Sequence, residues 1–310
     1  MKYQLNESHY EPHVRMRKWL FRLAFWALAV VLLVALVRKS DWSLTWTRLL
    51  NIPLDVIFFC IWGWLCSFAF RALRFQSEWK AYGHIGMMEA LNLTFLHNAA
   101  VVVVPFRVGE LGYPVFIRKL LNVSWQQCLR SLLWLRFQDG VVLLAIAFLL
   151  LPFLQLESRL ACVLIFILVV LFSKKWWLNL LRSRHFLIRH VRTFLHQRSD
   201  AWGWVWSFSN WACKLTVVAV MLQYLTGLTH TQSLRGALTG ELSALLPLTG
   251  PAGLGTYEAG VWSGLGLTWI EMKNLMSSVL LTHLFFLSIS LSGAVLALIW
   301  SAIKLKKLNS

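Results

Sequence analysis

The stretch of sequence that decides the fold is ELSALLPLTGPAGLGTYEAG, residues 241–260. It is long enough for one membrane helix, yet it contains prolines, glycines and two carboxylates, Glu241 and Glu258. Proline lacks an amide hydrogen and glycine favours non-helical backbone, so we predict that the helix breaks around Pro247, Gly250, Pro251, Gly253 and Gly255. Hydrocarbon cannot satisfy the freed peptide groups, and the broken segment must therefore be buried in protein or line a watery cavity.

A second interrupted stretch, PFRVGELGYP at residues 105–114, has the same character. Its backbone-breaking residues are Pro105, Gly109 and Gly112. The charged residues Arg107 and Glu110 either pair with each other, or Arg107 presents its forked guanidinium to a phosphate while Glu110 finds another partner. Interrupted apolar segments in corresponding positions of two halves indicate a transporter-type binding site near the bilayer midplane.

The composition places the chain among all-α, polytopic integral membrane proteins. Of its 310 residues, 58% are hydrophobic, 14% are charged and 18 are Trp. Its polar stretches are too short to bury a core of their own, so we expect a single transmembrane domain over residues 1–310. The apolar run from Leu20 to Val37 follows basic residues as in a signal peptide. Its length and the lack of a small-residue cleavage site before Arg38 favour a retained helix.

The net charge of +17 has a simple explanation in a membrane protein. Basic loops stay on the cytoplasmic side and contact anionic headgroups, so nucleic acid is not an expected partner. The five cysteines lie in or beside apolar stretches and lack the spacing of a metal site. We therefore expect buried thiols, no metal and no cofactor.

Clusters of Lys and Arg predict the topology. The clusters expected in the cytoplasm are residues 15–22, 71–80, 118–130, 174–198 and 304–307. The six full spans that satisfy this arrangement are residues 19–37, 54–70, 131–151, 160–173, 202–226 and 278–300. Two broken or re-entrant helical hairpins, residues 85–121 and 236–270, open to the cytoplasm and to the outside, respectively. Both termini then lie in the cytoplasm, and the halves, about 15–151 and 160–303, form an inverted repeat.

The segment of residues 174–198 contains seven Lys or Arg and no acid. Its apolar residues fall near one face of a helix, so the segment should lie in the cytoplasmic interface of the membrane. It serves either as a plain topology anchor or as a site for anionic headgroups.

Charged side chains inside apolar stretches are costly, about 2.5–3.5 kcal/mol each on insertion scales, and they mark functional sites by default. The candidates besides Arg107 are Glu110, Arg136, Asp139, Glu241 and Glu258. Arg136 and Asp139 repeat the spacing of Arg107 and Glu110, and Arg136 could face Glu110 or Glu258 across the bundle. A buried ion-pair network and an anion-binding cavity are both compatible with this pattern.

For three of the acids in apolar stretches, a structural role is an alternative to a functional one. Asp55 lies at the end of a span, where it would cap a helix. Glu89 and Asn92 belong to a polar stripe that either joins two helices or lines a cavity. Glu258 falls in the first turn of a helix expected to begin near Thr256, where it either neutralises the helix dipole or carries a proton in a coupled transporter.

These motifs resemble those of the lysylphosphatidylglycerol synthase transmembrane-region family, which includes the flippase half of the bacterial multiple-peptide-resistance factor and many stand-alone relatives. The similar segments are PFRVGELGYPVFIRKLLNVS, LRFQDG and LPLTGPAGLGTYEAG, within a resemblance over residues 15–300. By position, the family motifs fall on Arg107, Gly109, Glu110, Arg136, Asp139, Pro247, Gly250, Gly253, Gly255 and Glu258. Residues 249–252 depart from the family, which more often has Pro-Gly-Gly there.

The resemblance implies a polytopic helical fold with re-entrant elements that moves lipid headgroups between leaflets. The soluble aminoacyl-transfer domain of the fused relatives is missing, so lipid lysylation is not expected.

Three functions are compatible with the sequence. The first is a flippase or scramblase of the bacterial inner membrane, whose partners are membrane lipids with an anionic headgroup. The second is a secondary transporter of a small anion. The third, a membrane enzyme of lipid-linked sugar metabolism, is disfavoured because the chain has no Asp-x-Asp motif and no Ser/His/Asp set. We expect a protein that is not an enzyme, and we leave proton coupling and oligomerisation open.

Overall fold

The structure is a computed structural model that describes residues 42–180, 201–244 and 251–308, with some single residues between 27 and 38. Within these ranges the side chains of residues 105–107, 171–180, 251 and 305–308 are not described. The expected span 19–37 therefore lies largely outside the described residues, as do residues 181–198 of the amphipathic segment. Two site candidates, Pro247 and Gly250, also lie outside them.

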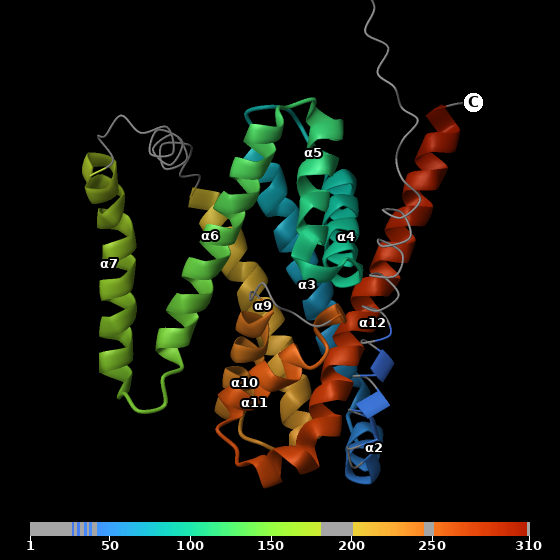
Figure 1. Cartoon of the computed structure of the whole chain (residues 1–310), viewed down its shortest axis with the longest axis vertical. Coiled ribbons are helices and arrows are strands. Elements are labelled where there is room, and N and C mark those ends of the chain that lie inside the picture. The colour runs from blue at the N-terminus through green and yellow to red at the C-terminus, as the bar shows by residue number, and fades with distance from the viewer. Residues whose placement is uncertain are drawn as a thin grey trace, which may run out of the picture.

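The described residues form an all-helical bundle without strands, as the composition predicts (Figure 1). Four helices are long and apolar enough to cross a bilayer. They are α3 (Leu54–Trp79), α6 (Trp125–Leu149), α9 (Ala201–Thr226) and α12 (Trp269–Leu308). The prediction of a polytopic, all-α membrane protein is thus confirmed.

Three of these helices are longer than the apolar runs that predicted them. Helix α3 continues past residue 70 to Trp79, and its Arg74 is buried inside the protein. Helix α6 begins at Trp125 and not at 131, because the Ser124 hydroxyl caps it by accepting from the Gln127 amide. Helix α12 extends the expected span of 278–300 at both ends. Hydropathy alone therefore locates these helices but not their ends.

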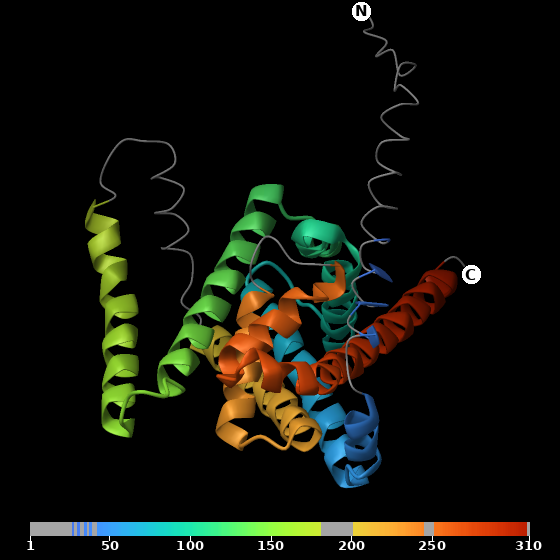
Figure 2. The same ribbon diagram turned by 60° about the horizontal axis from the view of Figure 1, so that its bottom comes forward.

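Two further helices lie beside this bundle. Helix α7 (Leu156–Leu180) contains the expected span 160–173 and stands apart from the bundle next to α6 (Figures 1 and 2). The short helix α2 (Trp42–Leu50) was not predicted. It is fixed to the bundle by Arg48, which donates to the Leu225 carbonyl at 2.9 Å, and by Thr45, which bonds Ser277 at 2.6 Å.

The first interrupted segment folds into a hairpin of α4 (Met87–Val103), the 3-10 helix η1 (Pro105–Leu111) and α5 (Gly112–Leu121). Its two ends meet, since a Cβ placed on Gly83 would lie 3.0 Å from the Leu121 side chain. The turn is equally tight. A Cβ on Gly109 would lie 1.9 Å from the Ala100 carbonyl oxygen, so only glycine lets η1 fold back on α4.

The second interrupted segment forms a hairpin of α10 (His230–Ser243), the 3-10 helix η2 (Pro251–Gly253) and α11 (Thr256–Leu265). Small residues let α10 and α11 approach closely, because Cβ atoms on Gly240 and Gly264 would overlap Val261 and Thr239, respectively. In Figure 1 this hairpin opens toward the end of the bundle that carries α2, and the first hairpin opens toward the other end. The inverted repeat and the two sequence halves stay predictions.

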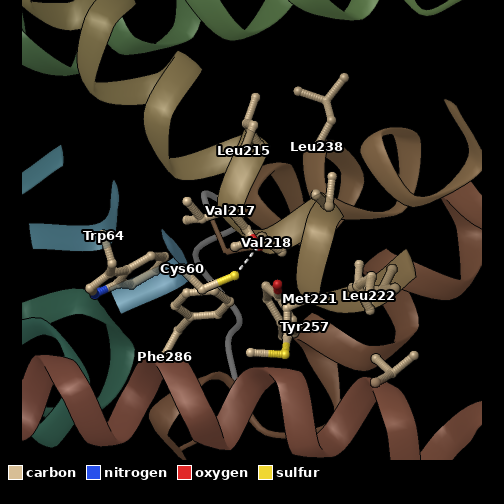
Figure 3. Close-up of a cluster of buried hydrophobic side chains, with 14 of the residues drawn as sticks. Cys60, Trp64, Leu215, Val217, Val218, Met221, Leu222, Leu238, Tyr257 and Phe286 are labelled. Atoms are coloured by element: carbon tan, nitrogen blue, oxygen red, sulfur yellow. Dashed lines mark hydrogen bonds between the residues drawn. The ribbon is translucent and has the colours of Figure 1, made fainter. Parts of the chain in front are cut away.

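The core has two apolar clusters that share α3. The larger one joins α3 to α9, α10, α11 and α12 around Trp64, Leu222 and Phe286 (Figure 3). The smaller one joins the other end of α3 to α4, α5 and α6 around Trp79 and Tyr113. The Trp79 indole donates to the Tyr113 hydroxyl at 2.7 Å, which fixes α5 on the bundle. Between the two clusters lie the buried charged groups.

Candidate functional site

Asp139 of α6 is the centre of a buried polar network, and only 3% of its surface is exposed. Its Oδ1 accepts from Arg74 Nη1 at 2.6 Å, from Trp211 Nε1 at 2.8 Å and from Ser207 Oγ at 3.2 Å. Its Oδ2 accepts from Arg136 Nη1 at 3.4 Å. The carboxylate therefore joins α3, α6 and α9, and charge-assisted bonds offset the cost of burying it.

Arg74 belongs to the basic cluster 71–80 that the sequence places at the cytoplasmic surface, but it is only 3% exposed. Its Nε donates to Gln138 Oε1 at 3.2 Å, and its Nη2 donates to the Leu135 carbonyl. Together with the Asp139 contact, these bonds use the whole guanidinium fork. Arg74 is thus a structural part of the bundle interior.

Glu110 and Arg136 connect the first hairpin to α6. Arg136 Nε donates to Glu110 Oε2 at 3.1 Å, while its Nη1 reaches Asp139. Of the two partners that the sequence allows for Arg136, the structure shows Glu110 and not Glu258. The side chain of Arg107 lies outside the described residues, so its role as a phosphate ligand stays a prediction.

A small cavity of about 20 Å³ adjoins this network. It is lined by Arg71, Arg74, Phe75, His97, Tyr113, Leu132, Leu135, Arg136 and Asp139. Among the described residues, no carboxylate lies within 4.0 Å of the Arg71 guanidinium. Among the described residues that line this cavity, three arginines accompany one carboxylate, Asp139, while Glu110 contacts Arg136 from η1 and Glu241 attracts Arg71 from farther away. A lining with more arginines than carboxylates suits an anion.

A second ion pair lies on the other side of Trp211. Lys214 Nζ of α9 donates to Glu241 Oε2 of α10 at 2.6 Å. The ammonium also lies 5.0 Å from the Trp64 ring centroid and 5.1 Å from that of Trp211. Because Trp211 donates to Asp139 with its indole nitrogen, this one side chain touches both charged groups. A continuous polar path thus connects η1 with the second hairpin.

The glycine-rich end of the second hairpin holds a third pair of ionisable side chains. Glu258 is 1% exposed, and its Oε1 lies 2.7 Å from His283 Nδ1 of α12. Its Oε2 accepts from the Gly255 amide at 2.7 Å, so it caps α11 as the dipole alternative predicts. Gly253 and Gly255 have positive φ values of 79° and 81°, which explains why the sequence uses glycine at these two positions.

The two interrupted segments meet inside the bundle, because η2 packs against α4. The structure brings four candidates into one network: Glu110, Arg136, Asp139 and, through Trp211 and Lys214, Glu241. Glu258 forms a separate pair with His283. Within residues 42–180, 201–244 and 251–308, no three His, Cys, Asp or Glu side chains gather as a metal site requires.

Three basic side chains inside the bundle, Arg74, Lys214 and His283, escaped the sequence interpretation, which emphasised acids in the apolar stretches. Lys214 and His283 each lie inside a predicted span, and an ionisable residue inside an apolar span is the criterion that identified the acids. Arg74 was assigned to a surface cluster because its neighbours are basic. A search for every ionisable residue within a span would have found Lys214 and His283.

The two weaker candidates have structural roles. Asp55 lies in the first turn of α3, where it faces the positive end of the helix dipole. Glu89 caps α4 through the Gly86 amide and pairs with Lys304 of α12 at 2.5 Å. Asn92 donates to Ser301 at 2.9 Å, so this stripe joins α4 to α12.

The buried charged network, the two broken hairpins and all but the last part of α12 lie within one segment that matches a known family. The profile of the lysylphosphatidylglycerol synthase TM region matches residues 19–293, which is most of the chain. The chain belongs to this family. The matched region includes every candidate site residue from Arg107 to Glu258. No curated protein and no solved structure matches the chain.

Proposed function

We propose that this protein moves phospholipid or lipid-linked headgroups between the leaflets of the bacterial inner membrane, as a flippase or scramblase that is not an enzyme. Membership of the lysylphosphatidylglycerol synthase TM family supports a role in membrane lipid metabolism. In the proposed topology both termini lie in the cytoplasm, because the chain ends are basic.

One observation carries the proposal: a cavity among the membrane helices has more arginines than carboxylates. Arg74 and Arg136 are held by Asp139, whereas Arg71 has no carboxylate within 4.0 Å among the described residues. Asp139 and Glu241 attract Arg71 only from beyond ion-pair distance, so a phosphate that contacts its guanidinium would add a direct, charge-assisted partner. Guanidinium binds phosphate through two parallel hydrogen bonds, so Arg71 suits the phosphodiester of a lipid headgroup.

The cavity of about 20 Å³ holds about one water molecule, so this conformation is closed to a headgroup. Entry requires a shift of the first hairpin, which covers the cavity with Tyr113 of α5. The Glu110–Arg136 contact is the ion pair that ties η1 to α6. We propose that an incoming phosphate competes for Arg136, releases Glu110 and lets the hairpin move outward. This exchange would couple headgroup binding to opening.

Glu258 and His283 supply the residues for proton coupling within the same proposal. The carboxylate and imidazole are 2.7 Å apart and lie beside the broken backbone of Gly253 and Gly255. A shared proton between them would respond to a transmembrane pH gradient. A change in their charge would alter the capping bond from the Gly255 amide and so the start of α11.

The narrowness of the cavity favours a second candidate, a transporter of a small soluble anion. About 20 Å³ is closer to the size of an inorganic anion than to that of a lipid headgroup. The two functions differ in whether acyl chains accompany the anion through the membrane.

Reconstitution into proteoliposomes separates the two functions. Translocation of phosphatidylglycerol and phosphatidylcholine, labelled on the headgroup, is measured beside uptake of radiolabelled phosphate and sulfate. Lipid translocation above that of protein-free vesicles, without anion uptake, supports the flippase or scramblase. Anion uptake without lipid translocation favours the second candidate, and the absence of both refutes a transport function in these lipids.

A further inference from the structure

A groove of about 540 Å³ lies between α4 and α12 on the side of α4 that faces away from the arginine-lined cavity. It is mostly apolar, and its walls include Leu91 and Phe95 of α4 and Ser292, Leu296 and Trp300 of α12. Phe95 lines the groove, whereas His97, two residues later, lines the cavity. The two spaces are therefore separate, and the groove is not part of the proposed translocation site.

The length of the groove matches one leaflet of a bilayer. On α12 its lining runs from Ser288 to Trp300, a distance of about 18 Å at the rise of an α-helix. The hydrocarbon core of one leaflet is about 15 Å thick. An extended acyl chain of a phospholipid that lies in this leaflet would fill the groove from end to end.

One end of the groove is polar and basic. Trp300 closes this end, and Lys304 Nζ lies 5.3 Å from its ring centroid. The Lys304 side chain remains about half exposed although it pairs with Glu89. The sequence adds Lys306 and Lys307 within the next turn. Tryptophan and lysine together are typical of the membrane interface, where the phosphate of a lipid lies.

The packing of α4 on α12 maintains the groove. A Cβ on Gly293 would lie 2.3 Å from the Phe95 ring, so the glycine lets Phe95 rest directly on α12. Glu89–Lys304 and Asn92–Ser301 connect the same helices toward the basic end. These contacts hold the walls at a fixed distance, and the groove is a preformed site.

We infer that this groove binds one acyl chain of an anionic phospholipid, with the phosphate next to Lys304. The apolar walls provide the affinity for the chain, and the lysines select the headgroup. The site would hold a lipid against α4 and α12 whether or not the protein transports lipids.

Photo-crosslinking in proteoliposomes tests the inference. The probes are phosphatidylglycerol and phosphatidylcholine with a diazirine in the middle of one acyl chain, and labelled peptides are mapped by mass spectrometry. We expect labelling concentrated on residues 88–95 and 288–300, and stronger with phosphatidylglycerol. The variant Ser292→Trp fills the groove from an exposed position and should lose most of this labelling. The matched control Val295→Trp, 55% exposed on α12 outside the groove, should retain it.

Two lysine variants test whether the site prefers an anionic headgroup. Lys304→Gln should lower the preference for phosphatidylglycerol by about fivefold, the effect of one basic residue at an anionic surface. Lys273→Gln, an exposed change at the other end of α12, should not lower it. Even labelling around α12, equal labelling of Ser292→Trp and Val295→Trp, or no dependence on the headgroup would each overturn the inference. Failure here leaves the proposed function intact, because the groove is separate from the cavity.

Discussion

Replacing Asp139 with Asn should destabilise the protein strongly, because the carboxylate holds two arginines inside the membrane helices. Arg74 is 3% exposed and would lose the carboxylate with which it pairs, and breaking such a buried pair costs about 3–5 kcal/mol. Arg136 adds less, because its side chain is 26% exposed and it keeps Glu110. At about 2–4 °C per kcal/mol, the melting temperature should fall by on the order of 10 °C.

Thermal unfolding in detergent, followed by intrinsic fluorescence, measures this effect. The control Asp55→Asn changes an exposed acid and should alter the unfolding free energy by less than about 0.5 kcal/mol. The double variant Arg74→Leu/Asp139→Leu removes both charges and should be more stable than Asp139→Leu alone. An Asp139→Asn protein as stable as the Asp55→Asn control would refute the argument that this ion pair supports the bundle.

Three further predictions follow from the packing and the charged pairs. Gly264→Ala should destabilise the protein by about 1–3 kcal/mol, because the new Cβ would lie 2.1 Å from the Thr239 hydroxyl. Gly140→Ala should not destabilise it, because nothing lies within 4 Å of the new Cβ, and thermal unfolding of both variants checks this. Lys214→Met should be less stable than Lys214→Met/Glu241→Gln, because the single change leaves a buried carboxylate without its cation; equal melting temperatures would contradict this. Glu258→Gln should fold but lose any stimulation of headgroup translocation by a pH gradient, and a full response would remove this glutamate from the coupling path.

The two broken hairpins could be predicted because their cause is local. Pro105, Gly109, Gly253 and Gly255 interrupt apolar runs, and no tertiary contact is needed to see that a straight helix is excluded there. The structure places a 3-10 helix in each interrupted stretch, η1 and η2. The same reasoning explains why the two segments meet, since each must find polar or protein partners.

The partners of the buried charges could not be predicted from spacing. Arg136 lies three residues from Asp139, yet its stronger contact is with Glu110 on another element. The basic cluster containing Arg74 resembles a cytoplasmic loop, and only the packing of α3 against α6 shows that Arg74 turns inward. Sequence identifies the ionisable residues that membrane burial makes costly, but three-dimensional structure decides which of them neutralise one another.

The hydropathy pattern also does not predict where the helices begin and end. Helix α6 starts six residues before its expected span because Ser124 and Gln127 form a capping box, a signal that was present in the sequence. Helix α2 is nine residues long, too short for a span, and was missed for that reason.

The most direct test of the central claim is headgroup translocation by Arg71→Gln in proteoliposomes. Arg71 lines the cavity without a carboxylate within 4.0 Å among the described residues, so its removal takes away the surplus charge and breaks no ion pair there. We predict that the Arg71→Gln protein is as stable as wild type but translocates phosphatidylglycerol much more slowly. Arg71→Lys should translocate at an intermediate rate, because it keeps the charge but loses the forked guanidinium. Arg130→Gln, on α6 outside the cavity, serves as the matched control. Wild-type translocation by a folded Arg71→Gln protein would contradict the claim that this cavity holds the phosphate.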